Sequence, residues 1–385
     1  MTHRHAFEAK DCSLRDLLSL KSTQAAQFPF GGKTIVLGGD PRQILPVIEG
    51  GTQAQIINAA ITNSPLWSSV TILHLTQNMR LCSTHLTESE RAQLAHFSAW
   101  ILDVGNGTIS ATERAGESKP TWIQIPDEFL LAPEKNQVPA FIAEIDPKLA
   151  ENYNDPSYLR QRAILTPTND VADLINDHIV DLIPGFHRQY LSCDRIAPQS
   201  NVGGTLDLLY PIEFLNSIDG NNFPQHKLLL KKGVPIMLLQ NLNQSEGLYN
   251  GTRIIITALG DLILEARIIT GTHIGKIVLI PRICLPLKTI RVPFVLERRQ
   301  YPIKICYAMT INKSQGQTLS QVGIYLKKPV FTHGQLYVAI SRVTSKEGLK
   351  ILIEDDDGRS SKETKNIVYK EIFSRIATNA TVTSS

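Results

Sequence analysis

Three polar loops of this chain each begin where a short apolar run ends. The loops span residues 38–43, 76–80 and 310–318, and the runs before them span residues 33–37, 70–75 and 304–309. Apolar runs this short predict buried strands of a parallel sheet. Open parallel sheets place their ligand-binding groups at the carboxyl ends of the strands. The pattern therefore predicts an α/β fold whose functional residues lie in these loops.

Length and composition narrow the class of protein. With 385 residues, of which 42% are hydrophobic, the chain can form two or three packed domains. No run approaches the roughly 18 apolar residues of a membrane span. The first residues lead into charged sequence rather than a signal-peptide core. We therefore expect no membrane association, and a cytosolic, nuclear or organelle-matrix setting.

The cysteines and histidines predict no metal centre. The five cysteines are scattered without Cys-x-x-Cys spacing, so neither a zinc site nor a disulfide framework is indicated. His3 and His5 have no further ligand cluster nearby.

Charge is spread unevenly although the net charge is only +3. Between residues 282 and 304 there are six Lys or Arg and a single acid, Glu297. This window is either a phosphate-facing surface or an ordinary solvated basic face.

Local patterns divide the chain into domains. Residues 162–166 have the pattern of a strand, and residues 169–182 that of a helix ended by Pro184 and Gly185. Between residues 228 and 303 short strands broken by hairpin signals predict a small barrel inserted in the second α/β domain. Further predicted elements are helices at 92–102 and 333–343 and strands at 321–325 and 349–353. We expect domains at 1–130, at 155–227 with 304–358, and at 228–303, followed by a flexible tail at 359–385.

The first two loops contain groups suited to a phosphate. Gly38 and Gly39 allow the backbone to approach a ligand, and Gln43 can both donate and accept a hydrogen bond. A glutamine so placed can sense a terminal phosphate and orient the attacking water. Arg80 can pair with phosphate as a bidentate fork. The alternative is an ordinary turn in each case, with Arg80 solvated.

The third loop has the chemistry of a nucleic-acid contact. Lys313, Ser314, Gln315 and Thr318 bring hydroxyls, an amide and an ammonium together on a loop that contains Gly316. Such donors bind the phosphates of a nucleic-acid backbone. The alternative is that these side chains only cap the backbone of a surface loop.

Arg342 lies late on the helix predicted at 333–343, near Tyr337 and Ser341. An arginine delivered across a domain cleft stabilises the charge that develops on a transferred phosphoryl group. The alternative is an arginine that forms a salt bridge at the surface.

One apparent phosphate-binding loop is rejected. Gly31, Gly32, Lys33 and Thr34 look like the end of a Walker A loop, but the pattern needs glycine where the chain has Gln27. A strand-like run follows, whereas a phosphate cradle needs a helix N-terminus there. No other stretch supplies the pattern, and no apolar strand ends in Asp-Glu.

Taken together, these motifs resemble those of superfamily-1 DNA helicases of the petite-integration-frequency family, in particular the helicase region of Helitron-type transposons. The resemblance covers residues 5–9, 38–47, 75–81, 163–169, 213–217, 234–239, 248–253, 281–283, 298–302, 310–319 and 333–343. It implies two RecA-like P-loop NTPase domains, with an SH3-like β-barrel inserted in the second. It also implies an ATP-dependent helicase that moves 5′ to 3′ on single-stranded DNA.

The resemblance also implies roles for individual residues. Gln43, Arg80 and Arg342 would contact the γ-phosphate of ATP, and the implied nucleotide-binding set is completed by Gly39, Asp40 and Gly316. Six further residues would line the DNA path or couple DNA binding to ATP: Thr310, Asn312, Lys313, Ser314, Gln315 and Thr318. Asn312 stands where many cellular members have histidine, which favours the transposon branch.

The biological setting follows from the same resemblance. It implies a monomer that acts on single-stranded DNA and DNA junctions, in recombination, repair, telomere maintenance or rolling-circle transposition. The implied location is nuclear, with the mitochondrion as the alternative.

The chain departs from the family pattern at its front. In the family, a segment like residues 2–8 follows soon after the Asp-Glu of the magnesium-binding motif. The ligands for ATP and Mg²⁺ would therefore lie in a missing N-terminal segment. We expect a truncated helicase that is inactive alone, because positioning and charge stabilisation supply nearly all of the catalysis in phosphoryl transfer. The alternative is a catalytically inactive, transposon-derived module that binds single-stranded DNA.

Overall fold

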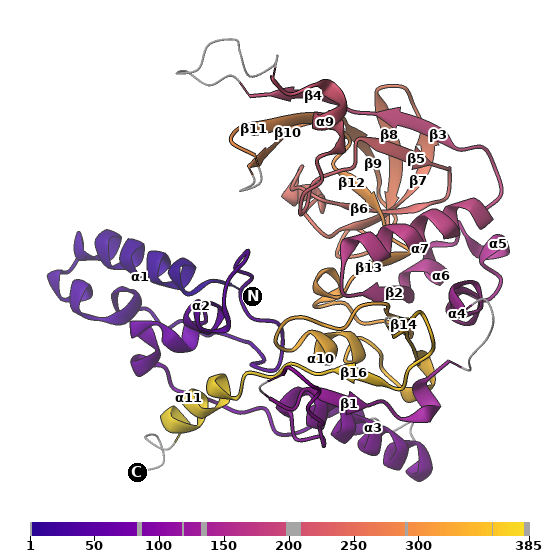
Figure 1. Ribbon diagram of the computed structural model, residues 1–385. Helices are drawn as coiled ribbons and strands as arrows, with labels where there is room; N and C mark the ends of the chain where they lie inside the picture. Colours follow the sequence, from indigo (N-terminus) through magenta and orange to yellow (C-terminus); the bar gives the residue numbers. More distant parts are fainter. Residues whose placement is uncertain are drawn as a thin grey trace.

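The computed structural model describes residues 2–82, 87–117, 119–131, 137–197, 209–288, 292–355 and 357–380. A helical lobe formed by the N-terminal residues lies to one side of a central parallel sheet (Figure 1). A region of antiparallel strands lies beyond the other end of the sheet. No helix among these residues is long and apolar enough to span a membrane.

The central sheet has four parallel strands. Their order is β13 (Ala308–Thr310), β2 (Arg162–Thr166), β14 (Gln321–Leu326) and β15 (Leu349–Ile353). These strands confirm the predictions at 162–166, 321–325 and 349–353. They are buried runs, as expected for a sheet covered on both faces.

Helices cover both faces of this sheet. Phe141 and Ile145 of α4 (Gln137–Ile145) lie in one core cluster with α7 (Asn169–Leu182). A Cβ on Gly323 of β14 would come within 2.6 Å of Ile145, so the missing side chain lets α4 approach the strand. On the other face, α3 (Glu88–Asn106) and α10 (Gln335–Ile340) contribute to a second cluster. The predicted helices at 92–102, 169–182 and 333–343 are therefore present, the last of them shorter.

The antiparallel strands form three sheets. One has the order β12 (Ile303–Ile305), β6 (Pro235–Leu238), β7 (Arg253–Leu259), β8 (Ile263–Ile268) and β9 (Ile277–Pro281). The others are β10 (Ile283–Lys288), β11 (Val295–Gln300) and β4 (Cys193–Ile196), and the pair β3 (Arg188–Leu191) and β5 (Lys227–Leu230). Hairpin connections that contain Gly260 and Gly271 join β7 to β8 and β8 to β9, as the hairpin signals in this stretch predicted.

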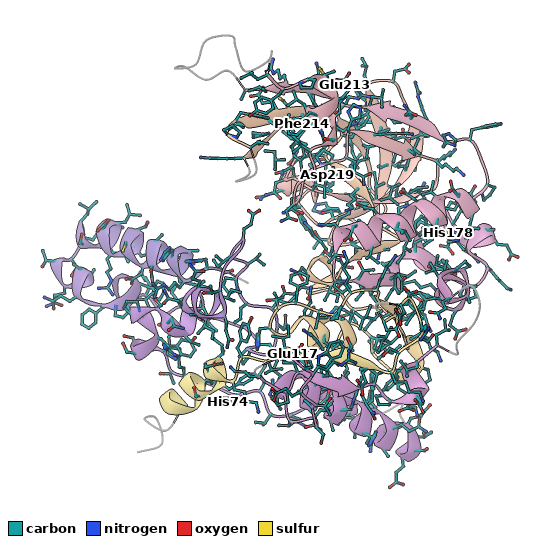
Figure 2. All side chains as sticks on the ribbon, viewed as in Figure 1. His74, Glu117, His178, Glu213, Phe214 and Asp219 are labelled. Atoms are coloured by element: carbon teal, nitrogen blue, oxygen red, sulfur yellow. The ribbon has the colours of Figure 1, made fainter. Side chains whose placement is uncertain are left out.

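This region begins earlier than the expected boundary at residue 228. Both β3 and β4 lie before it, yet they pair with β5 and β11. The reason is packing: Tyr190 meets Tyr301 edge to face at 5.3 Å, and Gln300 Nε2 donates to the Tyr190 carbonyl at 3.2 Å. At the outer end of the region, α9 (Ile212–Ser217) carries Glu213 and Phe214 (Figure 2).

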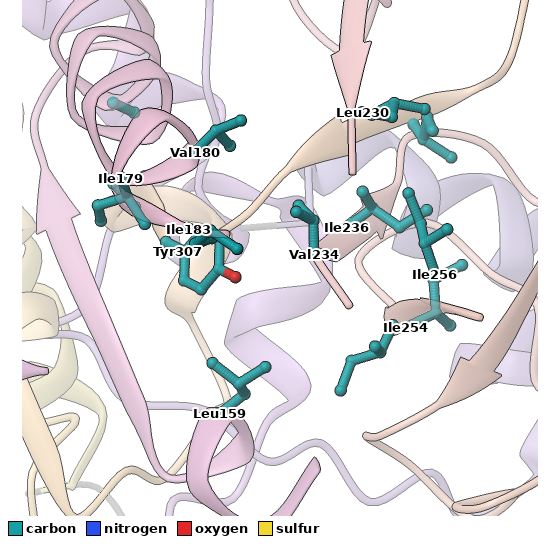
Figure 3. Packing of buried hydrophobic residues seen from close by; sticks show 14 of the residues in the cluster. Leu159, Ile179, Val180, Ile183, Leu230, Val234, Ile236, Ile254, Ile256 and Tyr307 are labelled. Carbon is teal, nitrogen blue, oxygen red and sulfur yellow. The ribbon is translucent and has the colours of Figure 1, made fainter. Parts of the chain in front are cut away.

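A continuous apolar core joins the second α/β domain to the antiparallel region. Ile179 and Ile183 at the end of α7 lie in the same cluster as Val234 and Ile256 of the antiparallel strands (Figure 3). Tyr307, between β12 and β13, is buried among them. Because these side chains form one cluster, the two parts behave as a single packed unit.

Two expected strands are absent from the N-terminal part. Residues 33–37 and 70–75 are extended but pair with no strand, so this prediction was wrong for the described chain. Leu73 is 88% exposed and Leu75 is fully exposed, which a buried strand would not allow. A strand needs a neighbour to satisfy its backbone, and none of the described strands lies beside either segment. Around them lie the helices α1 (Arg4–Ser19) and α2 (Gln53–Asn58).

The expected flexible tail is ordered between residues 363 and 376. The strand β16 (Glu363–Lys365) pairs antiparallel with β1 (Trp122–Gln124), and α11 (Lys370–Ala380) follows. Ile372 of α11 is buried against Leu45 and Ala60. The prediction failed because the segment is polar on average, whereas the few apolar residues of α11 share one face and gain from burial. Residues 381–385 lie outside the described part.

Candidate nucleotide and nucleic-acid interface

The loop at residues 38–43 lies against the segment that leads into α10. Asp40 Oδ2 accepts a hydrogen bond from the Tyr337 hydroxyl at 2.7 Å, and the carbonyl of Pro41 lies 2.9 Å from His333 Nε2. Arg42 follows, with its amide and guanidinium donating to Asp40 Oδ1. The first loop therefore rests on α10 (Gln335–Ile340) and on the residue pair before it, close in sequence to Arg342.

The hydrogen bonds of His333 fix its protonation. Its Nδ1 accepts from the Tyr369 amide at 2.9 Å, so Nε2 carries the proton and donates to Pro41. The side chain is fully buried, and burial lowers the pKa of His333. A neutral imidazole thus joins the first loop to the chain that precedes α11.

Gly334 allows this close approach. Its φ is +69°, and a Cβ there would lie 2.1 Å from the Arg42 carbonyl oxygen. Any side chain would push the two segments apart, and an L residue would also be strained at this φ. The backbone of the first loop therefore rests directly on the start of α10.

One side chain predicted to bind the nucleotide is in contact with one predicted to bind DNA. Gln315 Nε2 donates to Gln43 Oε1 at 2.7 Å. Both side chains are half-buried. By contrast, Gly38 and Gly39 have open space where a Cβ would be, so no neighbour in the structure requires glycine at either position.

Arg342 is held in place by its own domain. Its Nε donates to the Val338 carbonyl at 2.8 Å, Nη1 to the Gln317 carbonyl at 3.0 Å, and Nη2 to the Ser341 hydroxyl at 2.9 Å. A guanidinium has five N–H donors, so two remain available.

The positive charge of Arg80 also acts on Arg342. Burial is the main cause that lowers the pKa of Arg342, and the Arg80 charge lowers it further, whereas Tyr337 and Asp40 act in the opposite direction. The two guanidinium groups, from different parts of the chain, therefore lie close enough for their charges to interact, an arrangement that an anion bound near both would stabilise. Arg80 itself is exposed, on a short turn of 3₁₀ helix.

The third loop forms a 3₁₀ turn, Ile311–Ser314, directly after β13. Lys313 Nζ donates to Asn250 Oδ1 at 2.9 Å, which links the loop to the antiparallel region. Burial, and then the neighbouring charge of Lys304, lower the pKa of Lys313. A cation that is partly desolvated and repelled by another cation favours an incoming phosphate.

The other predicted DNA contacts differ in their surroundings. Asn312 Oδ1 accepts from Gln335 Nε2 at 3.2 Å, so α10 holds this residue too. Thr318 is exposed, and Thr310 is half-buried. Ser314 is buried and donates its hydroxyl to the Ile311 carbonyl at 2.7 Å. Gly316, with φ +81°, makes the turn that follows.

The basic window at residues 282–304 is not a single surface. Arg298 is fully buried and forms a bidentate pair with Asp194, at 2.7 Å from Nη2. Lys304 pairs with Asp173 at 2.8 Å. Arg299 is exposed, and Arg291 lies outside the described residues. Composition alone could not reveal that one cation of the window is part of the core.

Sequence reasoning missed the partners that assemble this interface. His333, Gln335 and Asn250 were not singled out, although all three lie in segments whose resemblance was noted. A histidine and a glutamine on either side of a glycine, at the start of an apolar helix, were the available signal. The partners of the three residues lie 292, 23 and 63 positions away, so the pairing itself could not be seen.

The described residues do not supply a magnesium site. None of them form a group of three or more His, Cys, Asp or Glu side chains able to hold a metal ion. Gln43, Arg80 and Arg342 do fit the outer side of a nucleoside triphosphate, because an amide and two guanidinium groups suit a terminal phosphate.

Two family descriptions match the sequence. PIF1-like helicase matches residues 1–115, and the 2B domain of DNA helicase Pif1 matches residues 213–259. The ATP-dependent DNA helicase PIF1 of Homo sapiens is 32% identical over 192 residues, which are 49% of this chain and 26% of that protein. Its Mus musculus counterpart is 27% identical over 343 residues, 84% of this chain and 40% of that protein. The chain thus spans less than half the length of these relatives.

Solved structures share the fold. Pif1 helicase from Bacteroides, in complex with ADP-AlF3 and single-stranded DNA, matches 100% of this chain and 74% of that chain, with a TM-score of 0.61 and 19% identity. Pif1 helicase from Candida albicans matches 98% and 74%, with a TM-score of 0.56 and 19% identity. The predicted architecture based on RecA-like domains is thereby confirmed. Over residues 1–115 and 213–259 this chain is therefore similar to PIF1-like helicases, and the relatives and solved structures extend the likeness of sequence and fold beyond these ranges.

Proposed function

We propose that these residues serve an ATP-dependent DNA helicase that moves 5′ to 3′ on single-stranded DNA. One observation carries the proposal: Gln43 from the first domain is hydrogen-bonded to Gln315 from the second, and the charge of Arg80 acts on Arg342 nearby. When residues of two domains surround one phosphate, a change in that phosphate can move the domains relative to each other. A motor needs such coupling.

In this proposal Arg80 and Arg342 hold the terminal phosphate between them. Their mutual repulsion is relieved by the negative charge, and the two free N–H donors of Arg342 are available to it. Gln43 would turn from Gln315 toward the phosphate and the attacking water. Loss of that hydrogen bond would release the loop that carries Lys313.

Bound ATP with Mg²⁺ would supply the phosphoryl group and neutralise its developing charge. The 385 residues contain no Gly-x-x-x-x-Gly-Lys-Ser/Thr pattern to hold them. We propose that this polypeptide alone does not hydrolyse ATP, and that a segment bearing Walker A and the Asp-Glu motif completes the site.

The test is a fusion that adds such a segment ahead of Met1. DNA-stimulated ATP hydrolysis should appear in the fusion and be absent from the polypeptide alone. In the fusion, Gln43→Ala, Arg80→Ala and Arg342→Ala should each lower the rate constant by about 10² or more, since each removes a group near the transferred phosphoryl. Arg359→Ala, which removes an exposed arginine away from the site, is the control for Arg342→Ala and should retain most of the rate.

Two results would contradict the assignment. The first is ATP turnover by the 385-residue chain that is lost with Arg342→Ala. The second is a fusion in which Arg342→Ala leaves the rate unchanged while Lys313→Ala abolishes hydrolysis in the absence of DNA.

A second candidate function is a non-catalytic module that binds single-stranded DNA. The observation that favours it is the Lys313 loop, whose contacts to Asn250 and Gln335 all lie within this chain. Binding without hydrolysis, even in the fusion, would support this function over the first. Asn312 in place of histidine remains our reason to propose the transposon branch, and with it rolling-circle transposition in the nucleus.

A further inference from the structure

A pocket of about 420 Å³ lies where the antiparallel region meets the second α/β domain. It is bounded by the chain between α5 (Leu149–Asn152) and α6 (Pro156–Arg160), by the end of α7, and by β7, β8 and the turn between β5 and β6. None of its lining residues belongs to the candidate interface described above. Its volume falls in the range of about 300–1,000 Å³ that is usual for small-molecule sites.

The charged side chains of this pocket are all cationic. Lys231, Lys232 and Arg267 line it, and no Asp or Glu does. Glu265 accepts from Thr257 of the wall at 2.7 Å but does not itself line the pocket. Some other cations of the antiparallel region have acidic partners, as Lys276 has in Glu246 at 2.7 Å. Within the described chain, Lys232 and Arg267 form no ion pair or side-chain hydrogen bond.

Lys231 places an ammonium group, a hydrogen-bond donor, in the wall of the pocket. It is buried, and its Nζ donates to the carbonyls of Val180 at 2.8 Å and Ile183 at 2.7 Å, at the end of α7. An ammonium has three N–H donors, so one is left, and the side chain lines the pocket. A buried cation with a free donor is stabilised by an anion.

The remaining walls suit a planar group. Phe186 follows the end of α7 and is 98% exposed, although it is apolar. The ring of Tyr153 forms another wall and is packed so closely that a Cβ on Gly233 would lie 2.7 Å from it. Aromatic side chains beside unpaired cations are the combination that stacks a base and holds its phosphate.

We propose that this pocket binds a nucleotide unit, with its phosphate at Lys231, Lys232 and Arg267 and its base against Phe186. The same chemistry is offered by a free nucleotide and by one residue of a single-stranded nucleic acid. This site is additional to the proposed helicase function and does not depend on it.

Photolabelling of the whole chain tests the proposal. The probes are 8-azidoadenosine monophosphate and an oligothymidylate that carries 5-iodouracil. Label should map to the peptides that contain Phe186 or Tyr153, with at least one probe. Lys232→Glu and Phe186→Ala should each weaken that labelling by about tenfold, as expected for the loss of a charge-assisted contact or a stacked base. Lys21→Glu, an equal charge change on an exposed residue of the N-terminal lobe, should not.

The two sources give different results. If unlabelled adenosine monophosphate displaces the label from both probes, the ligand is a free nucleotide. If it displaces only its own analogue, or if only the oligonucleotide labels, the ligand is a strand. The proposal is overturned if neither probe labels these peptides, or if both pocket variants label as strongly as the parent. Thermal unfolding, with DNA binding through the Lys313 loop, shows that each variant is folded.

Discussion

Gln43 and Gln315 are 272 positions apart in the chain, and a single hydrogen bond of 2.7 Å joins their side chains. One belongs to the loop predicted to read the nucleotide, and the other to the loop predicted to contact DNA. An amide has both a donor and an acceptor, so each glutamine can exchange this partner for a phosphate or a base without leaving a buried group unpaired. The pair is therefore a direct physical link between the two proposed sites.

Removal of the Tyr337 hydroxyl tests the contact between the first loop and α10. Tyr337→Phe should lower the free energy of unfolding by about 1–3 kcal/mol, because the partly buried carboxylate of Asp40 loses a donor. Urea denaturation measures the change. Tyr249→Phe is the matched control, since the structure shows no hydrogen bond from that hydroxyl. Equal stability of the two variants would mean that the Asp40 contact contributes nothing.

His333 should make stability depend on pH. Burial lowers its pKa in the folded state, so the unfolded chain takes up a proton first as the pH falls. The stabilisation is complete above the ordinary histidine value of 6.5 and is lost as the pH falls below it toward the folded value. Urea midpoints at a series of pH values should therefore fall less steeply in His333→Gln than in the parent. An identical slope in both proteins would exclude His333 as the cause.

Lys313 should contribute one phosphate contact to the binding of single-stranded DNA. Lys313→Ala should weaken binding and make the slope of log affinity against log salt shallower by about 0.7, the value for one phosphate on a single strand. Fluorescence anisotropy over a series of salt concentrations gives both quantities. Lys276→Ala, whose ammonium is paired with Glu246, should leave the slope unchanged. A slope that stays the same in Lys313→Ala would place the DNA path elsewhere.

Arg298 should be needed for folding rather than for DNA. It is buried against Asp194 and also donates to the carbonyls of Pro224, Leu215 and Asn216. Arg298→Ala should destabilise the protein by about 3–5 kcal/mol, because the Asp194 charge is left buried and unpaired. Its exposed neighbour gives the control: Arg299→Ala should change stability by no more than about 0.5 kcal/mol. If Arg298→Ala instead keeps full stability and loses DNA binding, the basic window is a DNA surface after all.

Sequence patterns predicted the second α/β domain well because its signals are local. The strand at 162–166 and the helix at 169–182 follow from apolar runs, spacing and the Pro184-Gly185 stop, all within one short stretch. The segments at 33–37 and 70–75 have equally good strand patterns, yet they are not strands here. Whether an apolar run becomes a strand depends on a neighbour in space, which its own residues do not specify.

The candidate site likewise contains residues that local sequence could predict and contacts that it could not. Gln43 and Lys313 could be chosen from residue type and position after a predicted strand, and Arg342 from its position late on a predicted helix. The contacts of His333 with Pro41 and of Tyr337 with Asp40 could not, because they join residues 292 and 297 positions apart. Burial decided the remaining cases: Ser314 and Arg298 have the right chemistry for a phosphate contact, but packing commits their polar groups to other partners.

The ribbon of β1 and β16 carries the chain between the two halves of the molecule in both directions. After β1 the chain passes on to α4 and the parallel sheet, and after β15 it returns through β16 to place α11 on Leu45 and Ala60. A lobe that hangs from one tether can swivel freely, whereas one attached by two adjacent, hydrogen-bonded strands can mainly bend about them. The ribbon should therefore act as a hinge and limit the first lobe to rocking toward and away from Arg342, so that each such movement follows the same path.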